Sequence, residues 1–160
     1  MAWKNDLLKD RVEVILVALG LDFELDSELS TIDASYRNTP IGNFNLKIKV
    51  CEHHLELNGV SEESIKLKHI YKVSKLLGML NKDKDANTPA LCLTNNWALK
   101  VESNIHVIDA KDKDEMNRVF DRFRNLSLRL NAFYLAYSYI EDGYSVDKAY
   151  NEIKELEEKE

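Results

Sequence analysis

The chain has 160 residues, of which 44% are apolar and 31% charged, and its formal net charge is −6 at pH 7. This length and composition allow one domain to bury a sufficient core without disulfides or a structural metal. The acidic balance argues against general binders of nucleic acid or of membrane surfaces, which present positive charge. We therefore expect a single domain over residues 1–160, without a nucleic-acid or membrane partner.

The sequence lacks the segments that are typical of secreted or membrane proteins. The apolar run at residues 14–21 follows charged residues and has no cleavage pattern of a signal peptide. No run approaches the ~18 apolar residues that a membrane helix needs. Cys51 and Cys92 are too few for a disulfide framework, so we expect reduced thiols in a cytoplasmic protein.

The first expected element is a helix over residues 5–20. Its apolar residues recur at helical spacing, and Gly20 stands where a C-terminal cap is expected. Val14 and Val17 widen the apolar arc beyond a single stripe. The sequence therefore predicts a helix that is buried on two sides.

About three antiparallel strands are expected over residues 21–60. Apolar residues alternate with polar ones at residues 44–50, and Phe23 and Leu25 alternate with acids in the same way. The sequence NTPIGN at residues 38–43 predicts a turn, which joins the strong strand to a weaker one at residues 29–36.

The apolar parity changes after Val50, from even-numbered residues to Leu55 and Leu57. Either a bulge or a tight reversal at residues 51–54 explains the change, and we favour the reversal. A turn at Asn58-Gly59 should then lead into a second helix over residues 62–81. The polar residues 81–89 are expected to connect this helix to the rest of the sheet.

The second half of the sheet is expected to be a meander with three-residue loops. Odd-numbered apolar residues continue from Leu91 to Val107. A loop of Thr94-Asn95-Asn96 pairs Leu93 with Trp97 and keeps these apolar residues on one face. Glu102-Ser103-Asn104 repeats the arrangement, and in both loops the last asparagine is expected at positive φ.

A long helix over residues 112–142 is the main organising element. Asp112 and Glu115 have the spacing of a capping box, Gly143 can close the helix, and apolar residues form one continuous stripe between them. At ~1.5 Å per residue such a helix is roughly 45 Å long, which exceeds the diameter of a domain of this size. We therefore predict a protein interface at its C-terminal end. The candidate interface residues are Phe133, Tyr134, Tyr137, Ile140 and Tyr144.

An additional C-terminal helix is expected over residues 144–160. Ser145 can cap it, and Val146, Ile153 and Leu156 lie on its apolar stripe. Its last residues are almost all charged, so we expect a mobile end. The element order is α-β-β-β-α-β-β-(β)-α-α, which predicts an α+β fold with an antiparallel sheet of five to six strands packed against helices.

The sequence offers no catalytic or cofactor-binding motif. It contains no P-loop, dinucleotide-binding or nucleophile-elbow pattern. Cys51, His53 and His54 lie close together, but on a strand Cys51 and His53 share a face while His54 points away. We therefore predict no enzyme, no cofactor and no metal site.

Three arginines lie on one side of the long helix. Arg118, Arg122 and Arg129 are candidate contacts for an anion or an acidic partner, because guanidinium groups bind carboxylate and phosphate with two hydrogen bonds. The alternative is ordinary ion pairing on the helix surface, for which Asp114 stands four residues before Arg118.

The chain resembles one known group of proteins, the class I type III secretion chaperones and the YbjN-like superfamily. LLKDRVEVILVALGLDFELD at residues 7–26 resembles their first helix and its Leu-Gly-Leu exit, and LCLTNNWALKVESNIHV at residues 91–107 resembles their final hairpin. The resemblance covers about residues 5–140, and the chain departs from it in the C-terminal helix and a possible extra strand. It implies a dimeric binding protein without catalysis.

The leading hypothesis is a non-enzymatic adaptor or chaperone-like protein that binds another polypeptide and forms a homodimer. It rests on the acidic charge, the lack of catalytic motifs and the long helix. One alternative is a small regulator or inhibitor encoded by a mobile element. Another is a ligand-binding sensor or enzyme with a pocket between sheet and helices.

Overall fold

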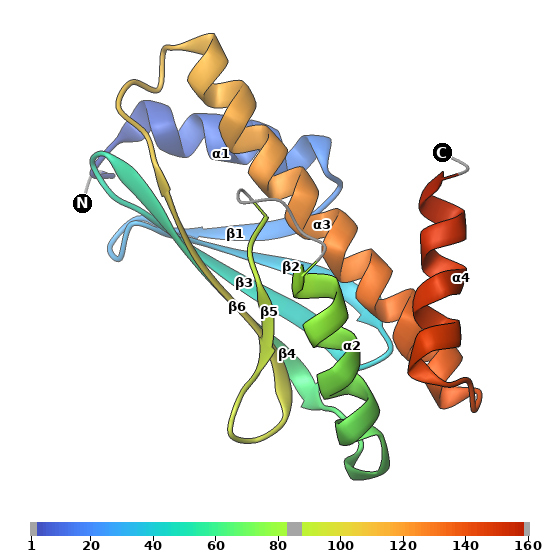
Figure 1. Cartoon of the computed structure of the whole chain (residues 1–160). Coiled ribbons are helices and arrows are strands. Elements are labelled where there is room, and N and C mark those ends of the chain that lie inside the picture. Colours follow the sequence, from blue (N-terminus) through green and yellow to red (C-terminus); the bar gives the residue numbers. More distant parts are fainter. Residues whose placement is uncertain (1–2, 83–87, 159–160) are drawn as a thin grey trace.

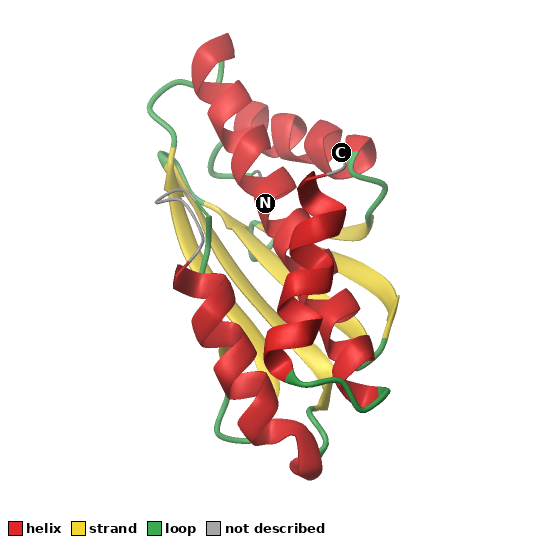
Figure 2. Cartoon of the chain, turned by 45° about the vertical axis from the view of Figure 1, so that its right-hand side comes forward, coloured by secondary structure: helices red, strands yellow, loops and turns green. Residues whose placement is uncertain are grey.

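Helices cover one face of an antiparallel sheet in the computed structural model of the chain, which describes residues 3–82 and 88–158 (Figures 1 and 2). The helices of the described residues are α1 (Asp6–Ala18), α2 (Ile70–Lys82), α3 (Lys113–Glu141) and α4 (Val146–Glu158). The strands are β1 (Asp22–Asp26), β2 (Thr31–Thr39), β3 (Gly42–Val50), β4 (His54–Ser64), β5 (Leu91–Leu93) and β6 (Ala98–His106).

The strands lie in the order β1-β2-β3-β4-β6-β5, and each neighbouring pair is antiparallel. The predicted α+β fold is therefore confirmed, but four strands precede α2 where about three were expected, and two follow it in the described residues. The expected reversal after Val50 is also confirmed. Val50 pairs with Leu55, and the Cys51 N–H donates to the His54 carbonyl at 2.9 Å.

The expected turn at Asn58-Gly59 is wrong, because both residues lie inside β4. A Cβ atom at Gly59 would lie 2.5 Å from the Phe44 ring, so the glycine makes room for an aromatic side chain of β3. The second helix consequently starts later than predicted. β4 continues to Ser64, a 3₁₀ turn follows at Leu67–His69, and α2 begins at Ile70.

The first loop of the predicted meander has the expected length but lies one residue further along the chain. The Thr94 N–H donates to the Ala98 carbonyl at 2.9 Å, and the residue with positive φ is Trp97 (64°), not Asn96. Leu93 therefore pairs with Leu99, not with Trp97. The one-residue shift of the loop leaves the apolar face of the sheet intact, since Leu91, Leu99 and Val101 are all buried.

The second predicted loop, Glu102-Ser103-Asn104, is wrong because β6 runs through it without a break. Ser103 pairs with Leu57 and Asn104 with Glu56, so β4 supplies a partner strand along this whole segment. The sequence reading assumed a partner close by in the chain, whereas the real partner is more than 40 residues away, as the Leu57–Ser103 pair shows.

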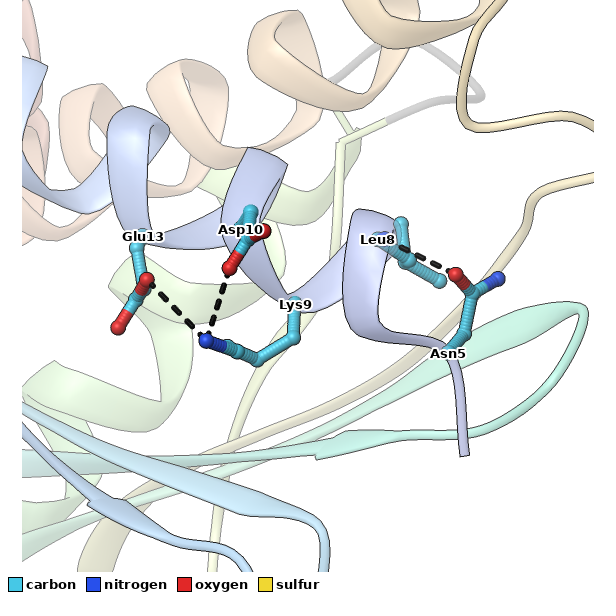
Figure 3. A network of polar contacts seen from close by, with 5 residues as sticks. All are labelled: Asn5, Leu8, Lys9, Asp10 and Glu13. Atoms are coloured by element: carbon cyan, nitrogen blue, oxygen red, sulfur yellow. Dashed lines mark hydrogen bonds and ion pairs between the residues drawn. The ribbon is translucent and has the colours of Figure 1, made fainter. Parts of the chain in front are cut away.

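Helix α1 forms as expected but buries one face only. The Asn5 side chain accepts from the Leu8 N–H at 3.0 Å, and Lys9 lies between Asp10 and Glu13 (Figure 3). Val14 and Val17 are 65% and 67% exposed, which contradicts the predicted burial on two sides. The sheet and α3 lie on one side of α1 (Figure 1), and the exposure of both valines shows that they are not part of this packing.

The long helix α3 is confirmed, with Asp112 as its N-cap and Gly143 at φ 96° just after its end. The Asp112 side chain accepts from the Asp114 and Glu115 N–H groups at 2.9 and 3.4 Å. Ser145 caps α4, which folds back against the C-terminal end of α3 (Figure 1). The chain's own last helix thus covers the end of α3 that the sequence assigned to a partner.

Two sequence expectations lie outside the described residues. One is most of the connector at residues 81–89, and the other is the mobile end after residue 158. Among the helices that are described, none is long and apolar enough to cross a membrane.

Candidate protein-binding groove

The predicted interface residues lie inside the chain and not on its surface. Phe133, Tyr134, Tyr137 and Ile140 are buried, and Tyr144 is half-buried against Tyr139, with 5.0 Å between the ring centroids. These five residues therefore do not form an exposed interface. The physical reason is α4, whose buried side chains Val146, Ala149 and Ile153 complete the core at this end.

A groove of about 980 Å³ opens instead between α3, α4, the corner from α1 to β1, and the end of β2. Leu128 and Leu135 of α3 and Leu156 of α4 line it, and they remain 53%, 48% and 44% exposed. Leu21 and Pro40 add apolar surface from the other two elements. Three large leucines from two helices thus face one open groove.

The groove follows from the way the two helices meet. Gly143 closes α3, and α4 runs back beside it but diverges from it toward the C-terminus (Figure 1). Leu128, Ala132 and Leu135 are spaced by four and three residues, so they form a second stripe on α3 beside its core stripe. Near its C-terminus α4 leaves this second stripe open.

The sequence reading missed these leucines. Leu128 and Leu135 have heptad spacing, which was a usable signal, but they fall outside the stripe from Met116 to Ile140. Sequence alone does not give the angle between α3 and α4. That angle decides which positions are covered and which are left in the groove.

Hydroxyl groups lie along the β2 side of the groove. The Tyr36 hydroxyl bonds to the Ser127 Oγ at 2.8 Å, and burial raises the pKa of Tyr36. Burial also raises the pKa of Tyr134 to about 12, and its hydroxyl has no hydrogen-bond partner among the described residues. The Thr39 side chain lowers the Tyr134 pKa by less than burial raises it, and the Thr39 hydroxyl itself donates to the Gly42 carbonyl.

The charged residues that line the groove are Asp22 and Arg37, and they pair with each other at 3.0 Å. The lining therefore combines the three exposed leucines with neutral hydrogen-bonding groups, which lie on β2 and also on α3 at Asn131 and Ser138. Such a surface suits the binding of an amphipathic segment, whose apolar side chains would cover the leucines while its polar groups bond to the neutral polar groups of the lining.

Only two of the three predicted anion-binding arginines line the same pocket. Arg118 and Arg122, together with Arg124, line a second pocket of about 490 Å³ between α3 and the end of β6, whereas Arg129 is not part of its lining. Arg122 donates to the Asn104 carbonyl at 3.3 Å. Glu115 and Asp121 line the same pocket, so its charge is mixed, and an anion contact stays a prediction.

The chain matches no known protein-family model and no curated protein. The resemblance to secretion chaperones therefore rests on the quoted residues and on the order of elements.

Proposed function

We propose that the chain is a non-enzymatic adaptor or chaperone-like protein that holds an apolar segment of another polypeptide in the groove between α3 and α4. The observation that carries the proposal is the exposure of Leu128, Leu135 and Leu156 in one groove of about 980 Å³. Apolar side chains that are gathered in an open groove mark a binding surface more often than scattered ones do.

The occupant that fits best is an amphipathic helix with basic residues at its flanks. Leu128 and Leu135 lie two helical turns apart, which matches apolar anchors at i and i+7 of a helix laid along α3. The chain carries a net charge of −6, and Glu152 and Glu155 stand next to the groove residues Ile153 and Leu156. Basic flanks would complement this charge and speed the encounter.

The test is affinity capture from an extract of the native cells, followed by mass spectrometry of the captured polypeptides. Wild-type protein is compared with a variant that carries Leu128→Glu and Leu135→Glu. Both leucines are about half exposed, so the substitutions should leave the fold intact, which circular dichroism checks. We expect a polypeptide with a basic, amphipathic segment to be captured by the wild type and lost with the groove variant.

The matched control carries Leu67→Glu and Tyr71→Glu, before and in the first turn of α2. These side chains are 80% and 83% exposed and do not line the groove. The control adds the same charge, so it should keep the captured polypeptide. If both variants lost the captured polypeptide equally, or if neither lost it, the groove would not be the binding site.

The proposal includes a homodimer in the cytoplasm. Since Phe133, Tyr134, Tyr137 and Ile140 are buried, a dimer needs another surface, and the exposed valines of α1 are the candidates. Light scattering should then give twice the 18.5 kDa of the chain for the wild type and for the groove variant. A separate variant with Val14→Glu and Val17→Glu on α1 should be a monomer, and a wild type that stays monomeric at high concentration would refute the dimer.

A further inference from the structure

We infer that Cys51, His54 and Glu56, completed by His106, form a binding site for a transition-metal ion of the zinc class. The site lies at one end of the sheet, where the β3–β4 turn meets the end of β6. It is independent of the groove, since none of these residues lines it.

The tight reversal between β3 and β4 brings the first two ligands together. Val50 pairs with Leu55, and the Cys51 N–H donates to the His54 carbonyl, so Cys51 and His54 oppose each other across a two-residue turn. Opposite residues of an antiparallel pair project to the same face. The sequence reading placed Cys51 with His53 because it treated this segment as one straight strand.

Strand geometry explains why Glu56 and His106 lie beside His54. Glu56 is two residues after His54, so it shares that face of β4, which is opposite to the buried Leu55. His106 of β6 pairs with His54 across the strands, and the centroids of their rings lie 6.3 Å apart. The turn and β4 therefore bring sulfur, nitrogen and oxygen donors together on the helix-free face of the sheet, and His106 lies beside them on β6.

The donor distances fit a single ion. The ligand atoms of Cys51, His54 and Glu56 all lie within 4.8 Å of one another, and His54 Nε2 is 3.3 Å from Glu56 Oε1. Ligand atoms around a tetrahedral zinc, with bonds of about 2.0–2.3 Å, lie roughly 3–4 Å apart. Small side-chain rotations would bring these three donor atoms to the spacing of a zinc coordination shell. His106 then supplies the fourth ligand.

The choice of metal follows from the donors. A thiolate and imidazole nitrogens favour Zn²⁺ and related ions over Mg²⁺ and Ca²⁺, which prefer oxygen. Cys51 is only 9% exposed, so its sulfur is shielded while His54 and Glu56 stay partly open to solvent. An ion can therefore enter from the open side of the sheet.

The turn that carries the ligands is held on both sides. The Asn5 side chain, which caps α1 (Figure 3), also donates to the Glu52 carbonyl at 2.8 Å. The Val107 N–H donates to the His53 carbonyl at 2.8 Å, which ties the turn to the end of β6. Backbone fixed in this way limits the reorganisation that metal binding requires.

The test is metal titration of the full chain without a histidine tag, under reducing conditions. Zn²⁺ binding is followed by calorimetry, and Co²⁺ is used as the spectroscopic probe, because a thiolate ligand gives a sulfur-to-cobalt charge-transfer band. We expect one Zn²⁺ per chain and this band in the wild type. Cys51→Ser should abolish the band, and His54→Ala, Glu56→Ala and His106→Ala should each weaken Zn²⁺ binding at least about tenfold.

The chain supplies two matched controls. Cys92→Ser removes the other thiol, which is exposed on β5, and His53→Ala removes the exposed histidine of the same turn. Both should bind Zn²⁺ like the wild type. No binding by the wild type, or equal losses in the controls, would overturn the site. Unchanged binding by His106→Ala would overturn the fourth ligand.

Discussion

At the scale of single residues, Gly59 shows how a missing side chain can determine a strand. The ring of Phe44 occupies the space that a Cβ atom at Gly59 would need, with 2.5 Å to the nearest ring atom. Phe44 is fully buried and contacts Tyr36 edge-on, with 6.0 Å between the ring centroids. The ring therefore cannot move away without disturbing its neighbours.

Gly59→Ala should accordingly destabilise the chain by about 1–3 kcal/mol, because the added methyl group overpacks the core. Gly78→Ala is the matched control, since Gly78 lies in helix α2 with nothing within 4 Å of the added Cβ. It should stabilise the chain by roughly 0.5–1 kcal/mol. Urea unfolding measures both changes, and a stabilising Gly59→Ala would contradict the packing.

Two buried tyrosines differ in whether their hydroxyl has a partner. Tyr134→Phe removes an unpaired hydroxyl and should be neutral or stabilising by up to about 2 kcal/mol. Tyr36→Phe removes the bond to Ser127 and should cost about 1 kcal/mol. Thermal unfolding of the two variants at pH 7 checks the contrast, and the same sign for both would contradict it.

The raised pKa of Tyr134 leads us to expect a loss of folding stability at alkaline pH. The Tyr134 pKa is raised from 10.0 to about 12, so the folded chain holds this proton more tightly than the unfolded chain does. Its contribution is therefore intact below pH 10 and is lost as the pH rises to about 12. The loss amounts to about 2–3 kcal/mol at 1.36 kcal/mol per pKa unit. Tyr134→Phe should lack this part of the decline in urea unfolding between pH 9 and 12.

At the scale of elements, the helices were easier to predict than the strand connections. A helix satisfies its hydrogen bonds locally, so the caps at Asp112 and Ser145, the glycine after α1 and the apolar spacing were sufficient to place α1, α3 and α4. A strand needs a partner that can lie anywhere in the chain. Local spacing therefore predicted a loop at residues 102–104, where β6 pairs with β4.

Replacing asparagine by valine separates the observed strand from the predicted loop. Asn104 lies inside β6, so Asn104→Val should be neutral or stabilising by up to about 1 kcal/mol, since valine favours strands. Asn38 has φ 59°, so Asn38→Val should cost about 1–2 kcal/mol, because its Cβ crowds the backbone. Urea unfolding measures both. A comparable cost at Asn104 would indicate a positive φ there and contradict the continuous strand.

At the scale of the whole molecule, the sequence predicted the layers but not the sites. Periodicity was sufficient for one sheet with helices on one face, because burial of apolar stripes depends on local spacing. The groove depends on the angle between α3 and α4, and the Cys51–His54 cluster depends on one turn. Both bring together residues whose proximity is set by packing, and the interface predicted at Tyr137 failed for the same reason.

The measurement that tests the binding groove most directly is site-specific photocrosslinking in the native cells. A photoreactive amino acid replaces Leu128, Leu135 or Leu156 in the groove, and Val14 or Val17 on α1 in the controls; all five side chains are exposed. We predict one cross-linked polypeptide, shared by the three groove positions and different from any product at the α1 positions. The same product from both surfaces, or no product from the groove, would contradict a polypeptide-binding groove between α3 and α4.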